Sequence, residues 1–282
     1  MNSQALKVLV PLDGSMTGES ILPAILPLIR SYPVEATLLE VVSSAEEGEQ
    51  ARRYLAARQE AFRKEGLMSR FQVEWGQPAD EILHLARTGT FDLVAMGTHG
   101  RTGLRRVLMG SVAEAVVRKS SVPVVLCRPD SRVGDWKRIV VALDGTPGAE
   151  EILEHALALA NRFQSTLHLV RVGLPLVCSD GFRGRGYEFS KTDSLPYLQS
   201  IRERLASERV MTVAESRDGM AGSEIVALAD ELGAGLICMT THGREEPLPG
   251  MGRSVAAEVI ENAPCPVLIL KMKETGVRCT VK

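Results

Sequence analysis

The feature that most constrains this chain is an internal repeat. The segment Lys7-Val-Leu-Val-Pro-Leu-Asp-Gly-Ser15 returns as Arg138-Ile-Val-Val-Ala-Leu-Asp-Gly-Thr146. Two later segments, which begin at Met96 and Val122, return as segments that begin at Met239 and Cys265. These later pairs lie further apart in the chain than the first pair. The second copy therefore holds a net insertion, which we place between Gly173 and Pro196.

Each copy alternates short apolar runs with longer amphipathic segments, which is the pattern of alternating strands and helices. The predicted strands of the first copy span residues 7–12, 36–42, 71–75, 92–96 and 123–127. The predicted helices span residues 19–31, 46–66, 78–88 and 111–120, with a kink expected at Pro27. This alternation predicts an α/β fold of two tandem doubly wound domains, residues 1–130 and 136–282, each with a parallel sheet flanked by helices.

Composition excludes several classes of partner. The net charge of −2 and an aromatic content of 4% argue against binding to nucleic acid. The apolar runs are strand-sized and predict no membrane span, and residues 1–7 have no signal-peptide pattern. The cysteines are scattered without metal-ligand spacing, at Cys127, Cys178, Cys238, Cys265 and Cys279. We therefore expect no metal site, and a cytoplasmic protein with reduced thiols.

Two segments at the predicted carboxyl edge of the first sheet have the features of a phosphate-binding site, and ligands of doubly wound sheets bind at this edge. One is the loop after the first strand, which holds Pro11, Asp13 and Ser15. The other follows the fourth strand and contains the residues Gly97, Gly100, Arg101, Gly110 and Ser111. Glycines allow backbone N–H groups to approach an anion, and the helix that begins at Ser111 adds a positive dipole end. Ser111 with Glu114 also fits a capping box.

The spacing Gly97-x2-Gly100-x9-Gly110-Ser111 resembles the ATP-binding motif of the universal stress protein family. The segments Val10-Pro-Leu-Asp-Gly-Ser15, Gly76-Gln-Pro-Ala-Asp-Glu-Ile82 and Val122-Pro-Val-Val125 resemble that family too. The resemblance covers nearly the whole chain as two tandem domains. It implies a five-stranded parallel sheet in each domain, of the adenine nucleotide alpha hydrolase-like kind. It also implies ATP or a related adenine nucleotide as ligand, and Mg²⁺ could accompany the phosphates.

The resemblance assigns a role to single residues. Asp13 would contact the ribose, Val41 would meet the adenine through its backbone, and Pro11 would shape the first loop. The residues that would hold the phosphates are Gly97, Gly100, Gly110, Ser111 and Val112. We add Arg101 to the predicted phosphate ligands only because its positive charge would attract a phosphate. The binding set also includes Ser15, whose hydroxyl follows an Asp-Gly turn, where it serves as a cap more often than as a nucleophile.

The second copy departs from this pattern. Thr240 stands in place of Gly97, and Arg253 stands in place of Gly110. Its loop reads Glu245-Glu-Pro-Leu-Pro249, so two acidic residues and two prolines replace a basic segment. Carboxylates repel a polyphosphate and each proline removes an N–H donor. We therefore expect the second site to be lost or altered.

No catalytic constellation accompanies the predicted site. His99 and His242 recur at matching positions, but neither has a paired acid or nucleophile in the sequence, and the lysine of a standard NTPase loop is missing. Together with the resemblance to universal stress proteins, this favours a regulatory ATP-binding protein of the stress response, with at most weak hydrolysis. Two alternatives stay open: a slow ATPase or adenylyl-transferring enzyme of the same superfamily, and an interaction module that binds no nucleotide.

The last strands of the two copies, residues 122–127 and 265–270, are apolar edges. If they align antiparallel, the two domains form a pseudo-dimer within one chain, and both edges are covered. This arrangement leaves further dimerisation of the whole chain open.

Overall fold

The computed structural model describes residues 5–31, 33–88, 91–98, 109–173, 191–242 and 254–272. The first half contains the strands β1 (Leu6–Pro11), β2 (Val34–Val42), β3 (Ser69–Trp75), β4 (Leu93–Gly97) and β5 (Val124–Cys127). Its helices are η1 (Gly18–Ser20), α1 (Ile21–Ser31), α2 (Ala45–Lys64), α3 (Pro78–Arg87) and α4 (Ser111–Lys119).

The second half repeats this order. Its strands are β6 (Arg138–Ala142), β7 (Thr166–Gly173), β8 (Met211–Asp218), β9 (Leu236–Thr241) and β10 (Val267–Lys271). Its helices are α5 (Pro147–Glu150), α6 (Ile152–Phe163), α7 (Lys191–Leu205), η2 (Ala206–Glu208), α8 (Ala221–Glu231) and α9 (Val255–Asn262).

Each half is a five-stranded parallel sheet with the same strand order. The first half reads β3-β2-β1-β4-β5, and the second reads β8-β7-β6-β9-β10. In both, the chain winds outward on one side of the first strand and then returns to its other side. The order therefore reverses between β1 and β4, and again between β6 and β9, which makes these the topological switch points.

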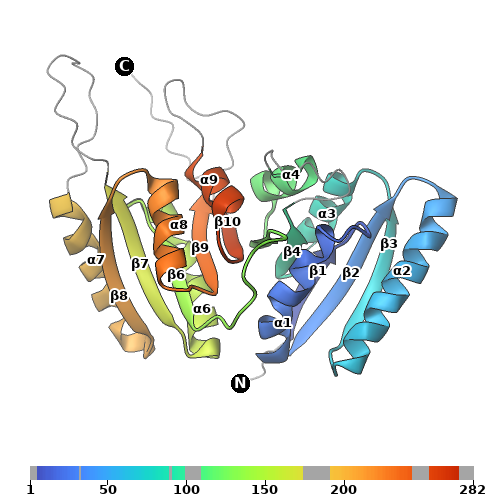
Figure 1. The fold of residues 1–282 in the computed structure, drawn as a ribbon, viewed down its shortest axis with the longest axis horizontal. Helices are drawn as coiled ribbons and strands as arrows, with labels where there is room; N and C mark the ends of the chain where they lie inside the picture. Colours follow the sequence, from blue (N-terminus) through green and yellow to red (C-terminus); the bar gives the residue numbers. More distant parts are fainter. Residues whose placement is uncertain are drawn as a thin grey trace, which may run out of the picture.

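Helices cover both faces of the sheet, so the doubly wound prediction is confirmed. Alternate residues of the central strands point to opposite faces: Val8 and Val10 of β1 join one hydrophobic cluster, and Leu9 joins the other. The first cluster includes side chains of α1, α2, α5, α6 and α7. The second includes side chains of α3, α4, α8 and α9. Figure 1 shows α2 and α7 at the two far ends of the molecule, with α4 and α9 near its middle.

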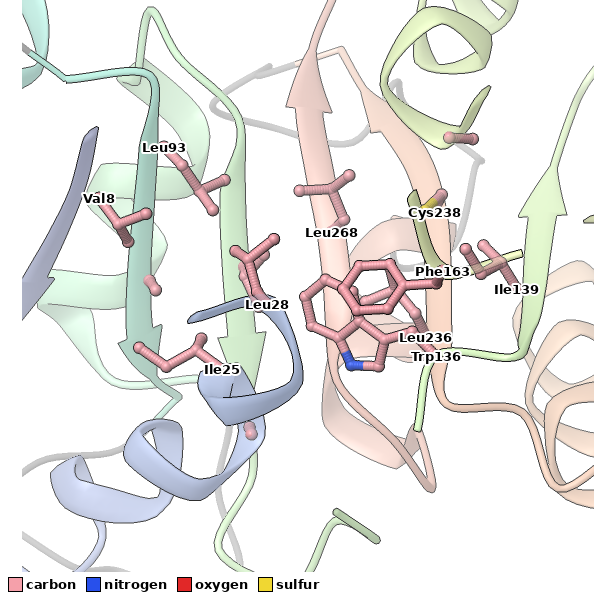
Figure 2. Packing of buried hydrophobic residues seen from close by; sticks show 14 of the residues in the cluster. Val8, Ile25, Leu28, Leu93, Trp136, Ile139, Phe163, Leu236, Cys238 and Leu268 are labelled. Carbon is pink, nitrogen blue, oxygen red and sulfur yellow. The ribbon is translucent and has the colours of Figure 1, made fainter. Parts of the chain in front are cut away.

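The two sheets join through antiparallel pairing of β5 and β10. Val125 lies opposite Leu268, with Leu126 opposite Val267 and Val124 opposite Ile269, and the result is one ten-stranded sheet. The predicted antiparallel alignment of the two last strands is therefore confirmed. Both hydrophobic clusters continue across this junction. In Figure 2, Ile25 and Leu28 of the first half and Trp136 and Leu268 of the second belong to the same cluster.

The segment between the halves is held against the second half. Trp136 is buried, and its ring lies 5.2 Å from the ring of Phe163. Arg132 donates its backbone N–H to the carbonyl of Pro264 at 2.7 Å and forms an ion pair of 2.9 Å with Asp230. A Cβ on Gly235 would overlap the backbone carbonyl oxygen of Asp135, so only glycine fits there. The connection between the two halves is thus packed against the second half.

The strand register locates the insertion in the second half. Leu38 of β2 corresponds to Leu169 of β7, and these two residues are as far apart in the sequence as the first pair of repeat segments. Their partners on the next strands are Phe71 and Ala214. These two are further apart in the sequence, by the same distance as the later pairs of repeat segments. The extra residues therefore lie between β7 and β8, which contains the predicted interval. Residues 174–190 of that interval lie outside the described part of the chain.

The first predicted helix is divided in the structure. Residues 18–20 form the 3₁₀ helix η1, and α1 then runs through Pro27 to Ser31. Pro23 lies in the first turn of α1, where a proline removes no helical hydrogen bond. In the described residues no helix is both long enough and apolar enough to cross a membrane.

Because the core is continuous across the junction, we expect the two halves to unfold together. Leu268→Ala removes a side chain that is 2% exposed, and should lower the free energy of unfolding by about 2–5 kcal/mol. Denaturant titration should still give one transition. Val255→Ala is the control: Val255 is 38% exposed, and its truncation should cost about 0.5 kcal/mol or less. Two separate transitions in Leu268→Ala, with only one of them shifted, would contradict a shared core.

Candidate functional site

The predicted site residues of the first half that the structure describes lie at the carboxyl edge of the sheet, beside the switch point. Pro11 ends β1 and lies opposite Leu39 of β2. Asp13 lies two residues after Pro11, and Val41 lies two residues after Leu39. Because Pro11 and Leu39 are paired, Asp13 and Val41 lie at the same edge of the sheet. Gly97 ends β4, on the other side of β1. The structure therefore brings together residues that are far apart in sequence, as predicted for a site at this edge.

The loop after β1 is built around the carboxylate of Asp13. Gly14 has φ of +74°, a conformation that glycine adopts readily. Ser15 donates its backbone N–H and its hydroxyl to Asp13 Oδ1, at 3.0 and 2.6 Å. Gly18 in turn donates its N–H to Ser15 Oγ at 2.9 Å. The Ser15 hydroxyl thus fixes the shape of the loop, which agrees with the cap role expected after an Asp-Gly turn.

Gly97 packs directly against this loop. A Cβ on Gly97 would lie 2.8 Å from the carbonyl oxygen of Thr17, and 3.1 Å from both Cα and the carbonyl oxygen of Gly18. These contacts involve backbone atoms, which cannot rotate away. Gly97 is therefore required for the close approach of β4 to η1, whatever else it contacts. Sequence reasoning did not identify Thr17 and Gly18, because their role depends on this contact across the fold.

The start of α4 differs from the prediction in one respect. The helix begins at Ser111 as expected, but the N-cap residue is Gly110, with φ −59° and ψ 149°. The predicted capping box of Ser111 with Glu114 is wrong, because Ser111 already lies inside the helix. Glu114 lies near Arg118 instead, at 3.9 Å. A glycine cap leaves the first-turn N–H groups without a side-chain acceptor from the cap residue.

The end of β4 and the start of α4 are tied together. Gly110 donates its N–H to the carbonyl of Thr98 at 2.8 Å, and Thr98 donates its N–H to the carbonyl of Cys127 at 3.0 Å. Ser111 is exposed at the helix end, and Val112 is half-buried against the core. Residues 99–108 of the loop between these elements, which include His99, Gly100 and Arg101, lie outside the described residues.

The second half keeps the first loop but not its surroundings. Thr146 donates its N–H and hydroxyl to Asp144 Oδ1 at 2.8 and 2.6 Å, which repeats the Asp13 turn. Opposite this turn, buried Thr240 stands where the first half has Gly97, and Ala149 stands where it has Gly18. The two positions that form the close contact between Gly97 and Gly18 in the first half therefore both carry side chains in the second half. Residues 243–253, which include Arg253, lie outside the described residues.

A buried arginine also distinguishes the second half. Arg171 of β7 is 7% exposed, and a Cβ on Gly145 would lie 2.9 Å from its Cζ. Its guanidinium therefore lies against the Asp144 turn, and it also lies 5.3 Å from the ring centre of Tyr197. The corresponding residue of the first half is Glu40, which is buried and has the opposite charge. Sequence comparison of the glycine loops alone did not find this difference.

The thiol near the first site is not activated. Cys127, at the end of β5, is buried, and burial raises its pKa to about 11. Its Sγ donates to the carbonyl of Arg128 at 3.3 Å. The thiol is thus protonated at neutral pH.

Among the described residues, no group of three or more His, Cys, Asp or Glu side chains is arranged to hold a metal ion.

Comparison with known proteins identifies the family. The model of the universal stress protein family matches residues 5–128 and again residues 135–271. A universal stress protein of Methanocaldococcus jannaschii is 28% identical over 141 residues, which cover 43% of this chain and 81% of that protein. One from Synechocystis is 30% identical over 139 residues, which cover 48% of this chain and 85% of that protein.

A solved structure shares the whole fold. The universal stress protein from Archaeoglobus fulgidus matches with a TM-score of 0.76 and 23% identity, over 96% of this chain and 98% of that one. The fold and the two repeats define a tandem doubly wound α/β protein. The chain belongs to the universal stress protein family, in its tandem two-domain form.

The packing of Gly97 predicts that alanine at this position lowers the free energy of unfolding, opposite to the usual effect of replacing a glycine in a strand. Alanine in place of a glycine in a strand ordinarily stabilises by about 0.5–1 kcal/mol. Gly97→Ala should instead lower the free energy of unfolding by about 1–3 kcal/mol, because the new Cβ meets the Thr17 carbonyl. Gly134→Ala is the control, since a Cβ there meets no atom within 4 Å. Chemical denaturation measures both, and a stabilised Gly97→Ala protein would refute the close-packing argument.

Proposed function

We propose that the first half binds ATP or a related adenine nucleotide at the carboxyl edge of β1 and β4. One observation carries this proposal: the N-terminus of α4 is tied to the end of β4, at the switch point and next to the Asp13 loop. The Gly110 N–H···O bond to Thr98 joins the two. An anion at this edge would meet the positive end of the α4 dipole and the first-turn N–H groups.

The phosphates are assigned to the glycine loop and the start of α4. Ser111 and Val112 supply backbone N–H groups at the first turn, where a helix has no internal acceptors for them. Gly110, whose N–H is bonded to the Thr98 carbonyl, has no side chain and so leaves space for the phosphates beside these groups. The exposed Ser111 hydroxyl adds a donor. We assign Gly97, Gly100 and Arg101 to the same phosphates on the basis of their spacing and charge. Mg²⁺ would accompany the phosphates and offset part of their negative charge.

The nucleoside is assigned to the β1 and β2 side of the edge. Asp13 Oδ1 is oriented by Ser15, and a carboxylate can accept hydrogen bonds from ribose hydroxyls. Val41, at the end of β2, is half-buried and offers an apolar surface and backbone groups for the adenine. Pro11 shapes the start of the loop. Ser15 acts indirectly, through Asp13.

The role we infer is regulatory rather than catalytic. Nucleotide binding would select one arrangement of the loop after β4, and a partner would respond to that arrangement in the stress response. The second half, with Thr240, Ala149 and Arg171 beside its first loop, serves in this proposal as the other member of an intramolecular pseudo-dimer. A slow ATPase or adenylyl-transferring activity is the alternative, and turnover well above trace rates would establish it.

Nucleotide content tests the proposal directly. We expect the purified chain, when denatured, to release about one adenine nucleotide per chain, because only one half has the glycine loop. Liquid chromatography with mass spectrometry identifies and counts it, and calorimetric titration of the stripped protein with MgATP measures the affinity. A chain that releases no nucleotide and gives no heat on titration would overturn the proposal.

Gly110→Arg tests the site itself, because it places the second half's residue in the first. The φ of Gly110 is −59°, so the backbone conformation is one that any residue adopts. We expect binding of MgATP to be lost, because the arginine side chain occupies the space at the start of α4, while the unfolding temperature stays close to that of the original protein. Gly134→Arg adds the same charge at an open position and should bind normally. Normal binding by Gly110→Arg would refute the assignment of phosphates to this loop.

A further inference from the structure

A charged cluster joins η1 to α2 behind the first loop. Tyr54 of α2 donates its hydroxyl to Glu19 Oε1 at 2.8 Å, and Arg58 Nε lies 3.0 Å from the same oxygen. The Arg58 guanidinium also lies 5.5 Å from the centre of the Tyr54 ring. Burial and the Glu19 carboxylate both raise the pKa of Tyr54 above its usual value, so the phenol remains a donor at neutral pH. Hydrogen bonds to a charged acceptor are stronger than those between neutral groups.

Glu19 connects this cluster to the predicted nucleotide site. Its backbone N–H donates to the carbonyl of Ser15 at 3.0 Å, and Ser15 holds the Asp13 carboxylate. The opposite side of the same segment carries Thr17 and Gly18, which pack on Gly97. The segment from Asp13 to η1 is therefore held between α2 on one side and the end of β4 on the other. A shift of Glu19 would move both the ribose and the phosphate contacts.

The second half contains the same bond in a different setting. Tyr197 of α7 donates its hydroxyl to Glu150 Oε1 at 3.2 Å, and Arg204 forms an ion pair of 2.8 Å with the other oxygen of that carboxylate. Tyr197 and Glu150 occupy the positions of Tyr54 and Glu19. This duplication supplies a control within one chain: the bond is the same, but it lies behind a loop without the glycine pattern.

We propose that Tyr54 is a positioning residue for the adenine nucleotide, which holds η1 through Glu19 and so fixes Asp13 and Gly97 in the geometry that binds. This inference rests on the proposed function of the first half. Tyr54 itself lies behind the loop and acts only through Glu19. The Tyr197–Glu150 bond, by contrast, supports the fold alone.

The test compares Tyr54→Phe with Tyr197→Phe in the full chain. Each variant keeps the ring and removes one hydroxyl, so the two unfolding temperatures should fall by similar amounts. Calorimetric titration with MgATP should show an affinity at least about fivefold weaker for Tyr54→Phe, the order expected from loss of a hydrogen bond to a charged group. Tyr197→Phe should bind as tightly as the original chain. Glu19→Gln and Glu150→Gln form a second matched pair, with the same expected contrast, should a phenylalanine variant not fold.

The outcomes distinguish a failure of the positioning role of Tyr54 from a failure of the proposed nucleotide binding. If the original chain does not bind MgATP, the proposed function fails, and this inference fails with it. If the original chain binds and the two tyrosine variants bind equally, the function stands and the positioning role of Tyr54 is refuted. Weaker binding by Tyr197→Phe alone would assign the nucleotide to the second half and refute both.

Discussion

The antiparallel pairing of β5 with β10 is the interaction on which the rest of the structure depends. Each half taken alone would end in an apolar strand with an unpaired row of backbone groups, which favours aggregation. The pairing of Val125 with Leu268 and its neighbours turns two five-stranded sheets into one of ten strands. Because the strands are apolar on both faces, both helical layers continue across the junction. Trp136, just before β6, adds to the core of the second half and fixes the connection between the copies.

The same fold produces two unequal sites. In the first half, Gly97 allows the backbone of β4 to approach η1 closely, and the absence of a side chain on Gly18 leaves space for the Asp13 carboxylate. In the second half, Thr240 and Ala149 occupy those two positions, and the Arg171 guanidinium lies against the Asp144 turn. The hydrogen bonds within the two turns are nearly identical. The difference between the sites therefore arises around the turns and not within them.

Hydrophobic periodicity predicted most elements well because it is a local property of the sequence. The predicted strand over residues 36–42 is observed as Val34–Val42, and the predicted helix over 46–66 as Ala45–Lys64. Two local features differ from the prediction for reasons of packing. The predicted helix over residues 19–31 is observed as the 3₁₀ helix η1, which packs against Gly97, followed by α1. The capping box at Ser111 was wrong because Gly110 adopts the cap conformation itself.

The sequence by itself determined the duplication, the order of strands and helices, and the spacing of glycines that distinguishes the halves. These follow from residue patterns within short segments, so no knowledge of long-range contacts is needed. Only the tertiary structure decided which distant residues meet: the contact of Gly97 with Thr17, the approach of Arg171 to Gly145, and the bond from Tyr54 to Glu19. These contacts depend on how strands and helices pack, and many different pairs of side chains in the sequence are chemically able to form them.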